Sequence, residues 1–280
     1  MKITLLGTGS PLPSATCAGP STLVQAADRN ILVDAGRGVI MRLIGAMCPP
    51  PLVTEVLLTH LHSDHICDLN DVVTTRWVAS PAATPLDVYG PPGTARMVDG
   101  LLAMLALDEG YRLAHHDDLR AGIGMKVNVT EVTPGDTLVL GGVRVSVHAT
   151  DHRPVAPTVG FRFEADGKIA ALAGDTVPCD GLDEMCRGAD AYVQTVVRED
   201  LVRQVATLVP TGERFLDILD YHSTVQQAAQ TAARAGVRTL VLTHFVPPVQ
   251  PGQEDEWRAM AAEHFSGNIV VGPDLTSVDC

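Results

Sequence analysis

A cluster of histidine and aspartate early in the chain is the clearest indication of chemistry. The segment His60-Leu61-His62-Ser63-Asp64-His65 places three imidazoles and one carboxylate within six positions. Neutral imidazole and carboxylate are ligands that zinc and similar divalent metals prefer. On an extended backbone His60 and His62 point the same way, whereas Asp64 and His65 can turn toward a second point. The spacing therefore predicts two metal ions side by side, each held by part of the cluster.

A dinuclear centre needs further ligands, and the ends of predicted strands supply candidates. Asp175 follows the apolar segment 169–173, where a carboxylate is placed to bridge two cations. His148 and His152 both lie near the end of another predicted strand. Only one of them is needed, and we favour His152. Loops that follow strands are common positions for chemistry.

His244 is the last candidate ligand, and the segment that leads to it repeats an earlier one. Residues 239–244 read Thr-Leu-Val-Leu-Thr-His, and residues 55–60 read Glu-Val-Leu-Leu-Thr-His. Two strand-then-Thr-His units, one in each half, indicate a pseudo-duplicated fold. Equivalent strands of such a fold end at one shared edge, which brings His244 to His60.

The remaining segments predict the elements that position these ligands. Alternating apolar residues between glycine and proline turns are typical of short strands, antiparallel in the middle of the chain. A helix is predicted over residues 94–107, with Met97, Leu101, Met104 and Leu105 on one packed face. Residues 108–124 lack periodicity and are predicted to form a surface loop. Further helices are predicted over residues 224–235 and 254–265, and strands over residues 3–6, 31–33, 86–89, 127–132, 137–140, 143–148 and 158–164.

Composition limits the partners. The 280 residues hold 20 Lys and Arg against 33 Asp and Glu, a formal net charge of −13. Binding to nucleic acid depends on cations that neutralise phosphates, so this balance makes nucleic acid an unlikely partner. No apolar stretch approaches the roughly 20 residues that cross a bilayer. The N-terminal segment is too short for a signal peptide, and six cysteines without a C-x-x-C pair argue against disulfides. We expect a cytoplasmic protein with no membrane partner.

The order of the motifs resembles the metallo-β-lactamase superfamily, in the branch that contains ribonuclease Z and related arylsulfatases and phosphodiesterases. The resemblance runs from residue 3 to about residue 248. It implies an α/β fold, an αββα sandwich of two mixed β-sheets flanked by helices, with two metals at one edge of the sheets. Residues 1–280 then form a single domain. The resemblance rests on residues 6–9 (Leu-Gly-Thr-Gly), 34–36 (Asp-Ala-Gly), 60–65, 174–176 (Gly-Asp-Thr), 222–224 (His-Ser-Thr) and 242–245 (Leu-Thr-His-Phe).

The resemblance also implies roles for single residues. Asp34 matches a carboxylate that orients a metal-bound histidine. His222 matches a histidine that lies over the site and contacts developing negative charge or passes a proton to the leaving group. Asp64 and His222 are the candidate catalytic residues. The implied ligands are His60, His62 and His152 for the first metal, Asp64, His65 and His244 for the second, and Asp175 as the bridge.

Two departures from the family pattern bear on the substrate. Ribonuclease Z members carry a long tRNA-binding arm between the ligands that match His152 and Asp175, but here only the 22 residues 153–174 intervene. Where the family has a His-Glu pair that assists proton transfer, this chain has Gln194 and Thr195. Without that pair, a substrate with a good leaving group, such as an aryl or enol oxygen, is favoured.

The expected function is that of a metal-dependent hydrolase, in which two divalent ions acidify a water and the hydroxide attacks a small anionic ester. Zinc is the expected metal, with manganese or iron(II) as alternatives. A phosphodiester or aryl sulfate is the first substrate hypothesis. The alternatives are a lactone or carboxyl ester, precursor tRNA cut at its 3′ side, and a non-catalytic metal-binding module. The resemblance also allows a homodimer.

Overall fold

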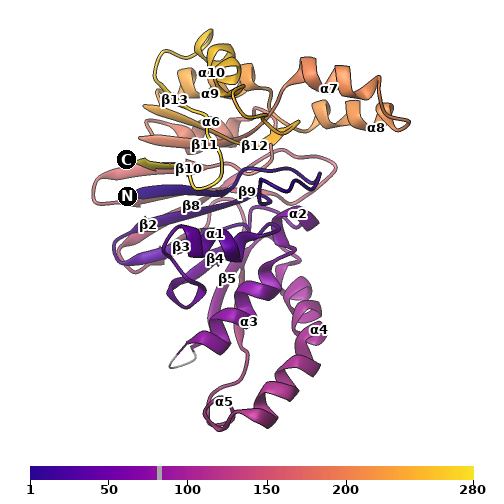
Figure 1. The fold of residues 1–280 in the computed structure, drawn as a ribbon. Helices are drawn as coiled ribbons and strands as arrows, with labels where there is room; N and C mark the ends of the chain where they lie inside the picture. The colour runs from indigo at the N-terminus through magenta and orange to yellow at the C-terminus, as the bar shows by residue number, and fades with distance from the viewer. Residues whose placement is uncertain (81–83) are drawn as a thin grey trace.

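Two seven-stranded β-sheets pack face to face in the computed structural model, which describes residues 1–80 and 84–280 (Figure 1). In order across the first sheet, the strands are Ser277–Asp279 (β14), Lys2–Gly7 (β1), Ser21–Ala26 (β2), Arg29–Val33 (β3), Glu55–Leu57 (β4), Leu86–Gly90 (β5) and Val127–Glu131 (β6). In order across the second, they are Thr137–Leu140 (β7), Val143–Ala149 (β8), Val159–Ala165 (β9), Lys168–Leu172 (β10), Ala191–Val197 (β11), Thr239–Val246 (β12) and Asn268–Val270 (β13).

Helices cover the outer faces of both sheets, so the predicted αββα sandwich is confirmed (Figure 1). The helices of the N-terminal half are Val39–Gly45 (α1), Pro50–Leu52 (η1), Ser63–Ile66 (α2), Leu69–Ala79 (α3), Thr94–His115 (α4) and Asp117–Ala121 (α5). Those of the C-terminal half are Asp180–Cys186 (α6), Glu199–Ala206 (α7), Gly212–Leu216 (α8), Asp217–Asp220 (η2), Val225–Ala235 (α9) and Glu254–Ala262 (α10).

The two sheets repeat one pattern of strand directions. The first four strands of each sheet, in the order given above, are antiparallel neighbours, and the last four are parallel neighbours. The pseudo-duplication is therefore confirmed, but the equivalent strands are not the two that end in Thr-His. By position β3 corresponds to β10, and β4 corresponds to β11 rather than to β12. β4 and β12 read alike because both are buried parallel strands that lead to the same edge.

Three apolar clusters hold the layers together. Phe161 and Phe163 lie among the buried side chains between the two sheets. Trp77 on α3 packs against the outer face of the first sheet, and Trp257 on α10 packs against the outer face of the second. The parallel strands are thus covered on both faces, which accounts for their continuous apolar sequences.

The predicted helix over 224–235 is confirmed as α9, with caps at both ends. The Thr224 hydroxyl accepts from the backbone of Gln227, and the Gln227 side chain accepts from the backbone of Thr224. Gly236 ends the helix in the left-handed conformation that glycine adopts readily. The predicted C-terminal helix is α10, which ends at Ala262 rather than at residue 265.

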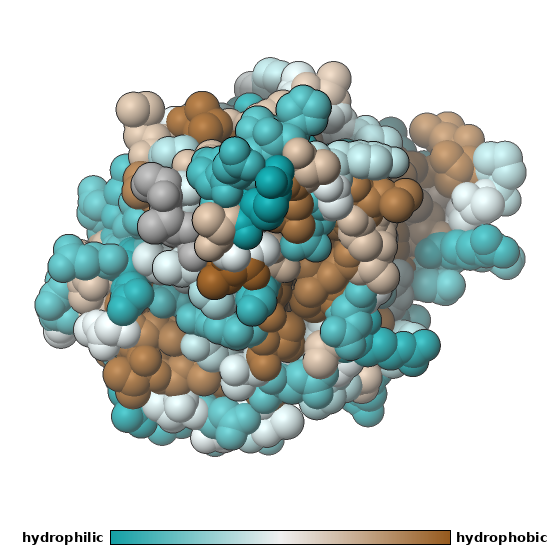
Figure 2. Space-filling model, turned by 90° about the horizontal axis from the view of Figure 1, so that it is seen from below, coloured by the Kyte–Doolittle hydropathy of each residue, from teal (hydrophilic) through white to brown (hydrophobic). Residues whose placement is uncertain are grey.

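The predicted loop over residues 108–124 is wrong for most of its length, because α4 continues to His115 and α5 follows. Arg112 donates to the Asp108 carboxylate one turn away at 2.7 Å, a pair that supports the added turns. Met104 is 64% exposed, so its predicted place on the packed face is also wrong. Seen from the side of these helices, the surface mixes hydrophobic and hydrophilic areas (Figure 2).

The C-terminal strand ties the chain ends together. β14 pairs with β1, so the last residues complete the sheet of the N-terminal half. The N- and C-termini lie side by side (Figure 1). Within the described residues, no helix combines the length and apolar character needed to span a membrane.

Candidate metal centre

The predicted ligands meet at one edge of the sandwich, on segments that follow strands of both sheets. His60 and His62 lie on the loop after β4, and Asp64 and His65 belong to the short helix α2 that this loop enters. The other ligands come from the second sheet: His152 from the connection between β8 and β9, Asp175 from the loop after β10, and His244 from β12.

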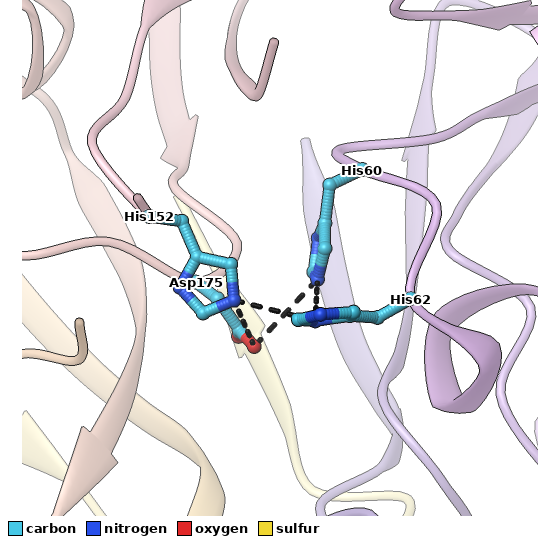
Figure 3. Close-up of side chains that lie close together, drawn as sticks. All are labelled: His60, His62, His152 and Asp175. Atoms are coloured by element: carbon cyan, nitrogen blue, oxygen red, sulfur yellow. Dashed lines mark hydrogen bonds and ion pairs between the residues drawn. The ribbon is translucent and has the colours of Figure 1, made fainter. Parts of the chain in front are cut away.

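One group of ligands consists of three histidines and one aspartate. His62 Nδ1 lies 3.1 Å from His60 Nε2 and 3.3 Å from His152 Nε2. Asp175 Oδ2 lies 3.8 Å from the Nε2 atoms of both His60 and His152. The four side chains point toward one another, two from each half of the chain (Figure 3). Bonds of 2.0–2.1 Å to a tetrahedral zinc place ligand atoms about 3.3 Å apart, close to these separations.

The second group consists of Asp64, His65 and His244, all buried. His244 Nε2 lies 3.3 Å from Asp64 Oδ2, and His65 Nε2 lies 3.7 Å from the same oxygen. One ligand atom of each residue lies within 4.8 Å of the others. Two imidazoles and one carboxylate therefore surround a second point.

Asp175 Oδ2 lies within reach of both groups. Besides its contacts with the first group, it lies 3.4 Å from His65 Nε2 and 3.6 Å from His244 Nε2. Burial by itself raises the pKa of Asp175, but the charges of His244 and His65 outweigh burial and hold this pKa well below its usual range. The carboxylate is therefore ionised, as a bridging ligand must be.

The environment sets the protonation of the histidines. Burial lowers the pKa of His60, His62 and His152, which keeps these imidazoles neutral and able to bind metal. Burial also acts to lower the pKa of His65, but the carboxylates of Asp175 and Asp34 outweigh it and hold the pKa well above the ordinary value. These carboxylates therefore favour the protonated form of His65, and a metal ion bound at Nε2 would take the place of that proton.

Asp34 contacts the second group through His65, on the side of the ring away from the other ligands. Its carboxylate accepts hydrogen bonds from His65 Nδ1, from the Thr59 backbone N–H and from the Thr59 hydroxyl, each at 2.8 Å. The bond from Nδ1 fixes the His65 ring with Nε2 facing the centre. Asp34 thus has the predicted position.

His222 lies beside the bridging carboxylate. Its Nδ1 donates to the carbonyl oxygen of Ile218 at 3.0 Å, which leaves Nε2 to face Asp175 Oδ2 at 3.2 Å. The chain continues from His222 into Ser223, whose hydroxyl donates to the carbonyl of Thr176, and then into the Thr224 cap of α9. These contacts fix the backbone that follows His222, so its imidazole stays beside Asp175.

Unusual backbone conformations aim two of the carboxylates and one histidine. Asp34 and His244 both have positive φ, 59° and 46°, which is uncommon for residues other than glycine. The register between β11 and β12 shifts between Thr195 and Val197, at the level of His244. Such a bulge turns a side chain out of the strand's alternation. Gly174, with φ 64°, delivers Asp175 through a close approach to the other sheet.

The donor set fits two divalent metal ions. Five buried polar atoms of the cluster lack a hydrogen-bond partner among the residues that the structure describes: Asp64 Oδ2, His65 Nε2, Asp175 Oδ1 and both ring nitrogens of His244. An unpaired buried polar group costs about 1–3 kcal/mol, so a cluster of them calls for a compensating ligand. Imidazole nitrogen and carboxylate oxygen are the donors that suit zinc, and also manganese or iron.

The structure brings together all seven predicted ligands, together with Asp34 and His222. His148 lies away from both groups on β8, where Ser146 is its hydrogen-bond partner. Sequence reasoning missed Thr59, whose hydroxyl lies 3.1 Å from His60 Nδ1, and Tyr221, whose carbonyl accepts from His152 Nδ1 at 2.8 Å. Each of them precedes a predicted site residue, His60 or His222, and the sequence holds no other indication that they contact the site.

The fold and the side chains gathered at this edge are those of a hydrolase of the β-lactamase superfamily. Residues 29–245 match the family described as the β-lactamase superfamily domain. The chain belongs to this superfamily, as the motifs indicated.

Closer relatives carry a more specific name. The chain is 53% identical to ribonuclease Z of Mycobacterium bovis (strain BCG / Pasteur 1173P2) over 281 aligned positions, which cover 100% of this chain and 98% of the relative. It is 54% identical to ribonuclease Z of Mycobacterium marinum with the same coverage.

Solved structures share the fold. The metallo-β-lactamase fold protein YhfI of Bacillus subtilis superimposes with a TM-score of 0.74 at 21% identity, covering 99% of this chain and 98% of the other. The short form of human tRNase Z superimposes with a TM-score of 0.72 at 22% identity, covering 100% and 99%.

The expectation that nucleic acid is an unlikely partner is wrong. Relatives more than 50% identical over their whole length are named ribonuclease Z. The error came from a net charge of −13, which is a sum over the whole chain. Attraction to a phosphate depends on the cations near it, within roughly 10 Å at ordinary salt, and not on that sum.

Proposed function

We propose that this protein is a metal-dependent endonuclease that hydrolyses a phosphodiester bond of RNA, and that its substrate is precursor tRNA cut at the 3′ side. The observation that carries the proposal is the seven-residue ligand set, in a chain 53% identical along its full length to a protein named ribonuclease Z. The same relatives favour RNA over an aryl sulfate or another small ester. The fold shared with human tRNase Z is in keeping with this substrate.

The residues of the two groups are the proposed metal ligands. His60, His62 and His152 hold one ion, Asp64, His65 and His244 hold the other, and Asp175 Oδ2 is shared. Zinc is the proposed metal because it prefers a small number of imidazole and carboxylate ligands, which is what each group offers. When bound, two such ions acidify a water near neutral pH and neutralise charge on the phosphate.

The protein's own groups manage protons and position. Hydrolysis forms one bond from a water oxygen to phosphorus and breaks one bond from phosphorus to the leaving oxygen, which must gain a proton. His222, in the form with a proton on each ring nitrogen, is placed to supply that proton from Nε2, because its Nδ1–H stays on the Ile218 carbonyl while Nε2 faces Asp175 Oδ2. Asp64 belongs to the second ligand group, and its proposed part in catalysis is to hold the attacking water in place from there. Proton transfer of this kind contributes typically 10²–10⁴-fold to rate.

An exposed cation next to the centre can meet the RNA backbone. Arg153 follows His152 in the chain, and its side chain is 80% exposed. Its guanidinium is paired with Asp151 at 2.5 Å. Exposed pairs of this kind contribute little, so a phosphate can compete for the arginine. A local cation of this kind offsets part of the acidic net charge.

The test is cleavage of a precursor tRNA that carries a 3′ trailer, by protein loaded with zinc or manganese. We expect a chelator-sensitive cut at the 3′ side of the tRNA, and slower turnover of an aryl phosphodiester. Asp175→Ala removes the shared ligand and should abolish cleavage. Asp183→Ala, a partly exposed residue paired with Arg234, is the matched control and should cleave normally.

Each outcome separates the hypotheses. Efficient turnover of the aryl phosphodiester without any cut in the tRNA would return the small-ester hypothesis to first place. Bound metal without turnover of either compound would point to a non-catalytic metal-binding module.

A further inference from the structure

His244 differs from the other proposed ligand histidines in how its ring is held. The rings of His60, His65 and His152 each have a hydrogen-bond partner at Nδ1, while Nε2 faces the centre. His62 is turned the other way and presents Nδ1 to the centre. His244 presents Nε2 to Asp64, and its Nδ1 is buried without a partner. Histidines that bind metals almost always donate the other ring N–H to a partner.

A small cavity lies beside His244, between the two sheets. Its volume is about 30 Å³. A single water needs about 10–15 Å³, measured in the same way, and two to four polar partners. The cavity therefore has room for one or two waters. Polar side chains from both sheets line it: Ser21, Thr22, Asp34, Thr59, Thr195 and Thr243.

Thr243 supplies a second unsatisfied group to the same cavity. Its hydroxyl is buried and has no hydrogen-bond partner in the part of the chain that the structure describes. Thr243 and Thr195 are directly opposite one another in the pairing of β12 with β11, so both side chains lie on the same face of the sheet. Thr243 and His244 thus both line one water-sized space, and within the described residues each has a buried polar atom without a partner, Oγ1 and Nδ1 respectively.

We propose that this cavity binds one or two waters that orient His244, which makes Thr243 a positioning residue for the metal centre. The water accepts from His244 Nδ1–H and exchanges a hydrogen bond with the Thr243 hydroxyl. A proton fixed on Nδ1 leaves the lone pair of Nε2 for the second metal. The inference rests on the proposed metal centre but not on the identity of the substrate.

The first test observes the water directly. Protein labelled with ¹⁵N in histidine is loaded with zinc, and the tautomer of each ring is read from long-range ¹H–¹⁵N spectra. We expect His244 as the Nδ1–H tautomer, with a magnetisation-transfer peak between this proton and a bound water. A His244 Nδ1–H without contact to water would overturn the proposal.

The second test uses variants and zinc affinity, measured by competition with a chelator. Thr243→Val keeps the shape and removes the hydroxyl, and it should weaken the second zinc about tenfold and shift the His244 ring signals. Thr243→Ser keeps the hydroxyl and should restore both. Thr4→Val changes a buried threonine outside the cavity, and it should change neither.

Wild-type zinc affinity together with unaltered His244 signals in Thr243→Val would also overturn the proposal. If Thr243→Val does not fold, Thr195→Val alters the same cavity from the neighbouring strand and is judged by the same two readouts. Failure of the protein to cut tRNA leaves both readouts intact, so it would count against the proposed function and not against the water site.

Discussion

Asp34 reaches the centre only through other residues. Its carboxylate binds His65 Nδ1 and two groups of Thr59, the residue whose hydroxyl lies next to His60 Nδ1. One carboxylate thus orients a histidine of each ligand group. This connection explains why a residue that belongs to neither ligand group occupies a strained backbone position, with φ of 59°.

Replacing Asp34 should therefore weaken metal binding more than it weakens the fold. We expect Asp34→Ala to lower zinc affinity about 10- to 100-fold, because partners that orient metal ligands contribute by this amount. Chelator competition measures the affinity. Asp71→Ala, on the exposed side of α3, is the control and should bind zinc normally. Unchanged affinity in Asp34→Ala would contradict the role given to Asp34.

His222 should affect turnover without affecting metal content. Its proposed role is to protonate the leaving group from Nε2, and it belongs to neither ligand group. We expect His222→Ala to lower kcat about 10²- to 10⁴-fold, the range of a general acid. Zinc content measured by atomic absorption should stay at the wild-type ratio. A large loss of zinc would show that His222 is instead part of the ligand set.

At the scale of elements, the loop after β10 can approach the first sheet because Gly174 has no side chain. Gly174 has φ of 64°, and a Cβ there would lie 2.7 Å from Thr59 Cβ. The glycine lets the loop of the second sheet approach the Thr59-His60 segment of the first. The close approach places Asp175 between ligands from both sheets.

Gly174→Ala should combine two penalties. The left-handed conformation costs about 1–2 kcal/mol with a Cβ, and the clash with Thr59 adds to that, for a total of about 3 kcal/mol. Gly167→Ala is a matched control, because Gly167 has φ of 70° and no atom near the new Cβ. Urea unfolding gives both free energies. Equal losses in the two variants would show that the close approach to Thr59 is not rigid.

Glu55 is a carboxylate on β4, a buried strand of the first sheet. Burial raises its pKa above 4.5, although the nearby hydroxyl of Thr54 and the charge of Arg29 act to lower it. A group whose pKa is raised by folding stabilises the protein below its unfolded pKa. This contribution is lost as the pH rises through the folded pKa.

Glu55→Gln should therefore gain stability relative to wild type as the pH rises from 4 to 7, by about 1 kcal/mol. The glutamine does not ionise, so it escapes the loss that the glutamate suffers. Urea unfolding of both proteins across this pH range gives the difference directly. A difference that is constant with pH would show that the Arg29 pair fully compensates the buried charge.

Features that depend on particular side chains could be predicted from the sequence, whereas backbone contacts and exposed helix turns could not. The side chains that meet at the candidate centre, from His60 to His244, could be predicted because metal binding demands particular side chains at strand ends. The carbonyl of Tyr221 could not, since any residue has one. The added turns of α4 were missed because exposed helices carry little apolar periodicity. The nucleic-acid expectation failed because net charge says nothing of where the arginines lie.

At the scale of the whole molecule, the centre joins the two halves of the chain. The segment 60–65 comes from the first half, and His152, Asp175 and His244 come from the second. β14, at the C-terminus, completes the sheet of the N-terminal half. We propose for these reasons that residues 1–280 fold as a single domain, with the metals acting as cross-links between its halves.

Metal loading should then stabilise both halves together. At zinc concentrations 100-fold above the dissociation constant, the gain is about 2.7 kcal/mol, or roughly 5 °C or more in Tm. The two tryptophans report on separate halves, since Trp77 packs under the first sheet and Trp257 over the second. Trp77→Phe and Trp257→Phe leave one reporter each, and both should show the same Tm, raised equally by zinc and lowered equally by a chelator. If zinc moves the transition of only one tryptophan, the halves unfold separately and the centre does not cross-link them.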